Sequence, residues 1–67
     1  MKDLKEVCQL AVELVSREGG QASRRKIVRT MIYRLGNDGN STLAEEGIDE
    51  AISDGFLSQV GDNLAIV

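Results

Sequence analysis

The residues of this chain best suited to chemistry are cations gathered in one short segment. Five of the eight lysines and arginines lie between Ser23 and Gly36, where no acidic residue occurs. Guanidinium and ammonium groups bind phosphate, and arginine often does so through two parallel hydrogen bonds. The cluster therefore predicts contacts to phosphate groups such as those of a nucleic-acid backbone. Its members are Arg24, Arg25, Lys26, Arg29 and Arg34.

These cations lie in a segment predicted to be a helix, with Ser23 as its N-cap. Three of them occupy the first turn, where the helix dipole already supplies partial positive charge. A bound anion would turn this repulsion into attraction, because the free backbone N–H groups, the dipole and the cations would all favour it. Tyr33 would add a hydrogen-bond donor or a stacking surface. The alternative, which the sequence leaves open, is that the arginines pair with the chain's own carboxylates.

Those carboxylates fill the next segment. The stretch from Asn37 to Gly55 carries six acidic residues and no basic one. Four of them project from one side of a predicted third helix, where they would repel a polyanion rather than read its bases. This side is predicted to be either a solvated acidic surface or a docking surface for a basic protein partner. It is formed by Glu45, Glu46, Asp49 and Glu50.

Catalysis and metal binding are not expected. The chain has no histidine and one cysteine, which excludes an intrachain disulfide and the usual zinc sites. The stretch from Asp38 to Asp49 superficially resembles a calcium loop, but Leu43 stands where that loop needs glycine and Asp49 where it needs a bidentate glutamate. We expect neither an enzymatic activity nor a cofactor or a small-molecule substrate.

The composition limits the classes of protein to which this chain can belong. A hydrophobic content of 42% and a charged content of 28% predict a single globular domain over residues 1–67. The net charge of −3 argues against indiscriminate nucleic-acid binding but allows a local basic surface. The N-terminal segment lacks the apolar region of a signal peptide, and no run approaches the length of a membrane span, so no membrane partner is expected. Cys8 lies on an apolar stripe, which favours a core position and a reducing, cytoplasmic setting.

Apolar periodicity predicts a first helix over residues 2–17. Leu10 and Val12 widen its apolar arc to roughly 200°, which exceeds the stripe that a surface helix needs. The helix is therefore either central or covered by a partner, for example a second copy across a twofold axis. Gly19-Gly20 is expected to end it.

Two more helices follow. The second, capped as described above, is expected to end at Gly36. The third is predicted to start at Thr42, which forms a capping box with Glu45, and to end at Gly55. Gly47 weakens this helix by about 1 kcal/mol relative to alanine, and close packing against another backbone would explain its presence.

The C-terminal segment predicts a β-hairpin. Two β-prone runs, Phe56–Val60 and Leu64–Val67, flank the tight-turn sequence Gly61-Asp62-Asn63. An isolated two-stranded hairpin is marginal in water, so this hairpin is expected to lie against the helices.

Three helices followed by a hairpin resemble the winged helix-turn-helix family. In that family the third helix ends in Asp/Asn-Gly, a hydrophobic pair begins strand two, and a short turn leads to strand three. The matching residues here are Asp54-Gly55, Phe56-Leu57 and Gly61-Asp62-Asn63. The resemblance implies an α+β fold over the whole chain, with a three-helix bundle and a C-terminal β-hairpin wing. The family's short strand between the first two helices would have to come from Gly20 to Ser23.

The family also suggests a function. Many members bind DNA, with the third helix in the major groove and the wing on the backbone or minor groove, whereas others bind proteins. We therefore expect a small transcription-regulatory protein that contacts DNA phosphates chiefly through its second helix. The alternative is a winged-helix protein-interaction module that uses the acidic side of the third helix, and the two oppositely charged faces also allow head-to-tail self-association. The residues expected to contact DNA are Arg24, Arg25, Lys26 and Arg29, assisted by Tyr33, Arg34, Gln59 and Asn63.

Overall fold

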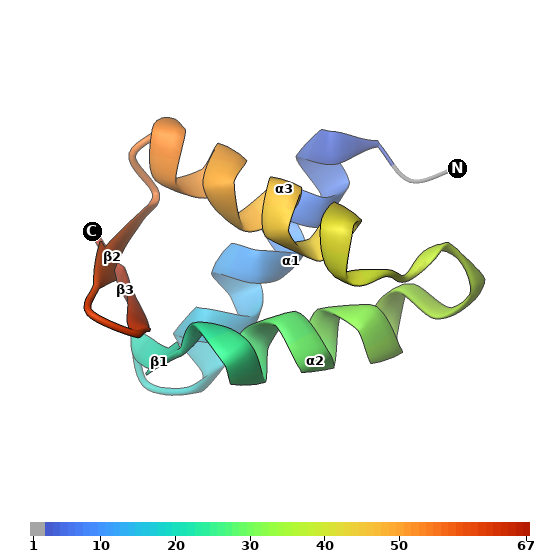
Figure 1. The fold of residues 1–67 in the computed structure, drawn as a ribbon. Coiled ribbons are helices and arrows are strands. Elements are labelled where there is room, and N and C mark those ends of the chain that lie inside the picture. Colours follow the sequence, from blue (N-terminus) through green and yellow to red (C-terminus); the bar gives the residue numbers. More distant parts are fainter. Residues whose placement is uncertain (1–2) are drawn as a thin grey trace.

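Three helices and three short strands form the molecule, and the computed structural model describes residues 3–67. The strands form a small antiparallel sheet at one end of the helices (Figure 1). This arrangement confirms the predicted α+β fold, a three-helix bundle with a C-terminal hairpin wing. In chain order the elements are α1 (Leu4–Arg17), β1 (Gln21–Ser23), α2 (Arg24–Leu35), the 3-10 turn η1 (Gly36–Asp38), α3 (Ser41–Ser53), β2 (Leu57–Val60) and β3 (Asn63–Ile66).

The first helix is central. It packs most extensively against α3, and it also contacts α2, β1 and β3. Leu10 and Val12 are partly buried against the core, so the central position of α1 accounts for its wide apolar arc. The predicted start of this helix at residue 2 lies outside the described residues. The buried core consists of Val7, Cys8, Ala11, Leu14, Val15, Ile27, Met31, Leu35, Ala44, Ile48, Ala51, Leu57 and Leu64.

The helix ends follow local capping rules, with one difference from the predictions. Ser23 caps α2, because its Oγ accepts the Lys26 N–H at 3.3 Å. The capping box predicted at Thr42 is wrong. Asn40 is the N-cap of α3 instead, and its Oδ1 accepts the Leu43 N–H at 2.8 Å. Glu45 therefore has no capping role, and its carboxylate is available for a longer-range contact.

A Schellman motif turns the chain from α3 into the wing. Gly55, with φ +83°, donates its N–H to the carbonyl of Ile52 at 3.1 Å, and Phe56 donates to the carbonyl of Ala51 at 2.9 Å. Only glycine adopts this left-handed conformation at no steric cost. The predicted end of the third helix at Gly55 is thereby confirmed.

The sheet has the strand order β1-β3-β2, with both pairings antiparallel. The segment between α1 and α2 does form a strand, although it is only three residues long, because it pairs with β3. The wing turn is shorter than predicted. Asn63 pairs with Val60 inside the sheet, which leaves Gly61-Asp62 as a two-residue loop with Gly61 at φ +60°.

Gly47 lies where α3 approaches α1 most closely. A Cβ atom at this position would collide with Val7 Cγ1 and would lie 3.0 Å from Val7 Cβ. The predicted close packing is therefore confirmed. Its partner is the Val7 side chain, and a Cβ would also lie 3.1 Å from the carbonyl carbon of Val7.

We expect Gly47→Ala to lower the free energy of unfolding by about 1–3 kcal/mol, since overpacking outweighs the roughly 1 kcal/mol gain in helix propensity. Urea denaturation measures the change. Adding Val7→Ala in the same chain should recover part of the loss, because it removes the colliding methyl groups. Ser53→Ala, at an exposed position of the same helix, serves as the control. Stabilisation by Gly47→Ala would contradict the close approach.

The Cys8 thiol is buried, with 5% of its surface exposed. Burial, followed by the nearby carboxylates of Asp54 and Glu50, raises its pKa above the ordinary value. The fold therefore favours the neutral thiol. The resulting contribution to stability is complete below the ordinary thiol pKa and is lost as the pH rises through the raised pKa of the folded state.

Thiol reagents should consequently react slowly with the folded protein at neutral pH and rapidly after denaturation. Between neutral and alkaline pH the parent protein should lose more stability than a Cys8→Ala variant does. Urea midpoints recorded at a series of pH values for both proteins test this expectation. Parallel stability curves would show that the thiol has no preferred protonation state in the fold.

Candidate nucleic-acid interface

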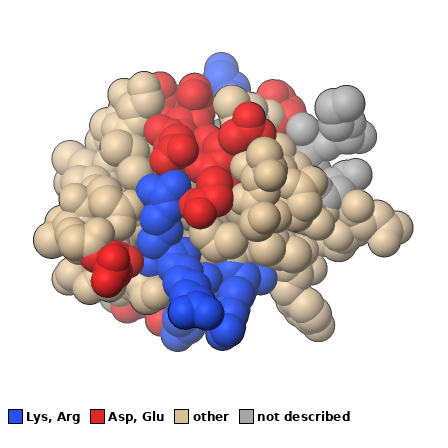
Figure 2. Space-filling view, viewed as in Figure 1, with Lys and Arg blue, Asp and Glu red and all other residues tan. Residues whose placement is uncertain are grey.

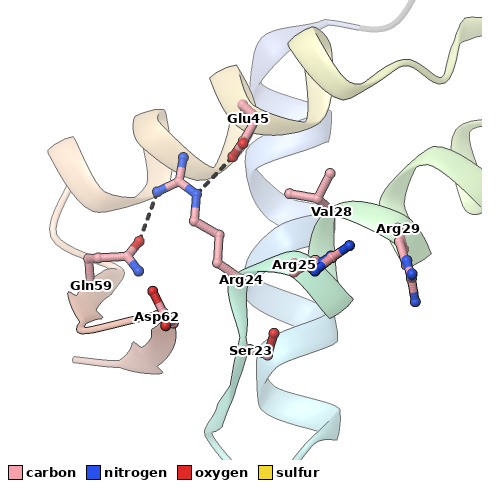
Figure 3. A pocket seen from close by; sticks show the side chains of 8 residues that line it. All are labelled: Ser23, Arg24, Arg25, Val28, Arg29, Glu45, Gln59 and Asp62. Carbon is pink, nitrogen blue, oxygen red and sulfur yellow. Dashed lines mark hydrogen bonds and ion pairs between the residues drawn. The ribbon is translucent and has the colours of Figure 1, made fainter.

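The cations at the start of α2 point in two directions. At about 100° per residue, Arg24 falls on the same side of the helix as buried Ile27 and Met31. Arg25 and Arg29 fall on the opposite side and are exposed. In Figure 3 the Arg24 side chain reaches toward α3 and the wing, whereas those of Arg25 and Arg29 point away from Glu45.

The Arg24 guanidinium binds three acceptors from two other parts of the chain. Its Nε donates to Glu45 Oε1, its Nη2 to Asp49 Oδ1 and its Nη1 to Gln59 Oε1, each at 2.8 Å. Gln59 in turn donates from Nε2 to the carbonyl of Gly61 at 2.7 Å. We call Arg24, Glu45, Asp49 and Gln59 the Arg24 clasp. It joins α2 to α3 and to β2, and two of its dashed contacts are visible in Figure 3.

Partial burial makes this clasp more than a surface ion pair. The Arg24 side chain is 24% exposed, whereas those of Glu45 and Asp49 are 48% and 67% exposed. Burial lowers the pKa of Arg24, but the hydrogen bonds that it donates to the carboxylates of Asp49 and Glu45, together with their negative charge, raise it by more, so the pKa lies above its ordinary value. The guanidinium therefore stays charged throughout the range in which proteins fold.

The start of α2 is also occupied by the chain itself. The backbone N–H of Arg24 donates to the carbonyl of Asp62 at 2.9 Å, and Lys26 Nζ forms an ion pair with Glu18 at 2.8 Å. Pairing with the chain's own carboxylates, the alternative that the sequence left open, therefore holds for Arg24 and Lys26. We withdraw the phosphate-binding roles of Arg24, Lys26 and Gln59. Asn63, the other wing residue, lies in β3.

Two signals in the sequence could have revealed the clasp. Arg24 precedes Ile27 and Met31 by three and seven residues, which is the spacing of one helix face. Gln59 alternates with buried Leu57 along a strand, so both side chains lie on the same face of the sheet. A cation at the margin of the core and an amide on the core-side face of the sheet are thus placed where they can meet, and partial burial of the cation favours a partner.

The remaining cations of α2 form an exposed surface. Among the side chains that the structure describes, none forms an ion pair with Arg25, Arg29 or Arg34. Tyr33 is 85% exposed beside them. Arg25, Arg29 and Tyr33 share one side of α2, and we call these three residues the cationic strip. Arg34 lies on another side of the helix, where it lines a hollow together with Glu6 and Glu13 of α1. In Figure 2 the basic side chains gather at the lower edge of the molecule, over α2, and the acidic ones gather above them, over α3.

A hollow separates the two charged surfaces. It lies where the start of α2, α3 and the wing meet, and the clasp crosses one side of it (Figure 3). The side chains that the structure describes include no group of three or more able to hold a metal ion. The arrangement offers arginine donors along the outer edge and no nucleophile beside a base, so it suits anion binding at a surface. The hollow is lined by Ser23, Arg24, Arg25, Val28, Arg29, Glu45, Gln59 and Asp62.

The predicted acidic surface is partly neutralised. Two of its four carboxylates, those of Glu45 and Asp49, belong to the clasp. Glu46 is exposed and has no partner among the described side chains, and Glu50 is half-buried. The acidic surface available to a partner is thus smaller than the sequence indicates.

Replacing Arg24 by alanine should lower the free energy of unfolding by about 1–2 kcal/mol, since three charge-assisted hydrogen bonds are lost while their acceptors remain partly solvated. Arg24→Lys should recover little, because an ammonium group cannot match the planar fork of the guanidinium. Denaturant titration gives both values. Arg25→Ala changes the neighbouring arginine, which has no partner among the described side chains, and should stay within about 0.5 kcal/mol of the parent protein. Equal losses for Arg24→Ala and Arg25→Ala would rule out the clasp.

No helix among residues 3–67 has both the length and the apolar character needed to cross a membrane. Comparison with family models, with curated proteins and with solved structures gave no match to this chain.

Proposed function

We propose that this protein binds the phosphate backbone of nucleic acid, in the first place DNA, through the cationic strip of α2. One observation carries the proposal. Arg24 and Lys26 pair with carboxylates of the chain itself, whereas Arg25 and Arg29, on the outer side of the same helix, have no ion-pair partner within the described part of the chain. Two such arginines on one side of a helix in an acidic protein suit an anionic ligand.

The spacing of the strip fits a polyanion. Arg25 and Arg29 are one turn apart, so their Cα atoms are separated by about 6 Å along the helix axis. Tyr33 continues the same row one turn later, where its hydroxyl group can donate to a phosphate oxygen. Both guanidinium groups are exposed and can each bind a phosphate through two hydrogen bonds.

The same surface argues for binding without sequence preference. Phosphate contacts position a protein on a duplex but carry no sequence information. The outward side of α3, where the winged-helix resemblance places base reading, presents Glu46 and Asp49 instead of donors. A duplex bound along α2 would leave these carboxylates beside it rather than in its groove.

The proposed role is therefore a non-enzymatic, DNA-associated regulatory protein. The protein-interaction alternative has less support, because Glu45 and Asp49, two of its four expected contact residues, are held in the clasp. A cytoplasmic location is part of the proposal, and the single buried, reduced Cys8 fits a reducing compartment.

Fluorescence anisotropy with a labelled random-sequence duplex tests the proposal. Binding should be measurable at micromolar protein in about 50 mM salt and should weaken steeply as the salt concentration rises. Each of Arg25→Ala and Arg29→Ala should weaken binding and reduce the slope of log K against log salt by about 1. Two unrelated duplex sequences should bind alike.

Arg17→Ala is the matched control. Arg17 is an exposed arginine of α1 that pairs with Glu13, so its loss changes the net charge equally without touching the strip. If Arg17→Ala weakens binding as much as Arg29→Ala does, the effect is one of net charge and the strip is not the site. Absence of binding by the parent protein at low salt would overturn the proposal.

A further inference from the structure

Tyr33 is the most exposed of the large hydrophobic side chains that the structure describes. The exposed fraction of this residue is 85%. Neither its ring nor its hydroxyl group has a partner among the described residues. A ring with so much of its surface in water contributes little to the core. The packing of the fold therefore gives no reason for an aromatic residue at this position.

The position of Tyr33 relative to the arginines suggests a reason. Arg25, Arg29 and Tyr33 follow one another at intervals of four residues along α2. Successive members of this row are about 6 Å apart along the helix axis, and each step turns the side chain by only about 40°. The ring therefore follows the two guanidinium groups along one side of the helix. A strand of nucleic acid that is bound to the arginines through its phosphates would pass the ring.

A duplex cannot use the face of this ring. The bases of a duplex stack on one another, and its backbone presents phosphate and sugar, so only the Tyr33 hydroxyl group finds a partner there. The bases of a single strand are free, and each has a π-face that can lie against an aromatic ring. An exposed ring in line with two arginines therefore fits an unpaired strand better than a paired one.

The magnitudes indicate that stacking decides the preference. A single strand has a lower charge density than a duplex, so each phosphate contact contributes about 0.7 instead of about 0.9 to the salt slope. For two arginines at about 50 mM salt, this difference favours the duplex by about threefold, with 1 M salt as the reference. Stacking of one base on an aromatic ring raises affinity by roughly 5- to 150-fold. The gain from stacking thus exceeds the loss from charge density.

We propose that the cationic strip binds single-stranded DNA in preference to duplex, with Arg25 and Arg29 on phosphates and one unpaired base stacked on the ring of Tyr33. This inference rests on the proposed function, because both use the same two arginines. Every base can stack, so the preference is for an unpaired strand and not for a sequence. A single strand also needs no helix in a groove, so the carboxylates on the outward side of α3 do not oppose this mode of binding.

Fluorescence anisotropy with a labelled thymidine homopolymer and a random-sequence duplex of equal length tests the preference. The parent protein should bind the homopolymer more tightly at about 50 mM salt. Tyr33→Ala should weaken homopolymer binding at least about fivefold, whereas Tyr33→Phe, which keeps the ring, should retain most of it. The two variants should affect duplex binding alike, because the hydroxyl group that both lack is the only part of Tyr33 that reaches the duplex backbone.

Nuclear magnetic resonance observes the stacking directly. Tyr33 is the only tyrosine of the chain, which has no tryptophan, so its ring signals can be assigned without ambiguity. The ring current of a stacked base should shift these signals upfield when the homopolymer binds. Duplex binding should shift them much less. Ring signals that stay in place at saturation with homopolymer would overturn the proposal.

Phe56→Ala is the matched control. Phe56 is also an exposed aromatic residue, at 55%, but it lines a hollow beside α1 and does not belong to the strip. Its replacement should leave homopolymer affinity within about twofold of the parent value. If the duplex binds but Tyr33→Ala and Tyr33→Phe bind the homopolymer alike, stacking is rejected and the proposed function stands. If the parent protein binds neither nucleic acid at low salt, the proposed function fails as well.

Discussion

The guanidinium group of Arg24 joins α2 to α3 and to the wing. The relative placement of these elements determines which charges the protein exposes. The guanidinium donates to α3 through Glu45 and Asp49 and to the wing through Gln59. A domain of this size has one small core and, with one cysteine, no intrachain disulfide. A partly buried, charge-assisted contact that spans three elements is therefore a substantial part of what holds the hairpin against the helices.

The clasp also sorts the charges of the protein. In the clasp two carboxylates of α3 pair with one arginine of α2, whereas Arg25 and Arg29 lie on the outer side of the same helix. Neighbouring residues of one cationic run thus take different roles because successive helix positions differ by about 100°. Arg24 binds the protein to itself and Lys26 pairs with Glu18, whereas Arg25 and Arg29 face solvent without a carboxylate partner among the described side chains.

The hairpin likewise turns one face toward the core and the other toward solvent. Leu57 and Leu64 fill the core from one face of the hairpin, whereas Phe56, Val60 and Val67 are exposed on the other. Through Gln59, whose side chain belongs to the clasp, β2 connects the wing to α2.

Local patterns in the sequence were sufficient to determine the helices, their glycine ends and the hairpin, because hydrophobic periodicity and turn residues act over a few neighbouring positions. The exception at Asn40 shows the limit of such patterns, since Asn40 and Thr42, two residues apart, both have side-chain oxygens suited to capping and the helix uses the first. Only the tertiary structure decided that β1 is a strand, because its three residues depend on β3 for their hydrogen bonds. Tertiary structure also decided which arginines are free. The partners of Arg24 lie 21, 25 and 35 residues away along the chain, and the sequence alone does not reveal which distant carboxylates the fold brings within 2.8 Å.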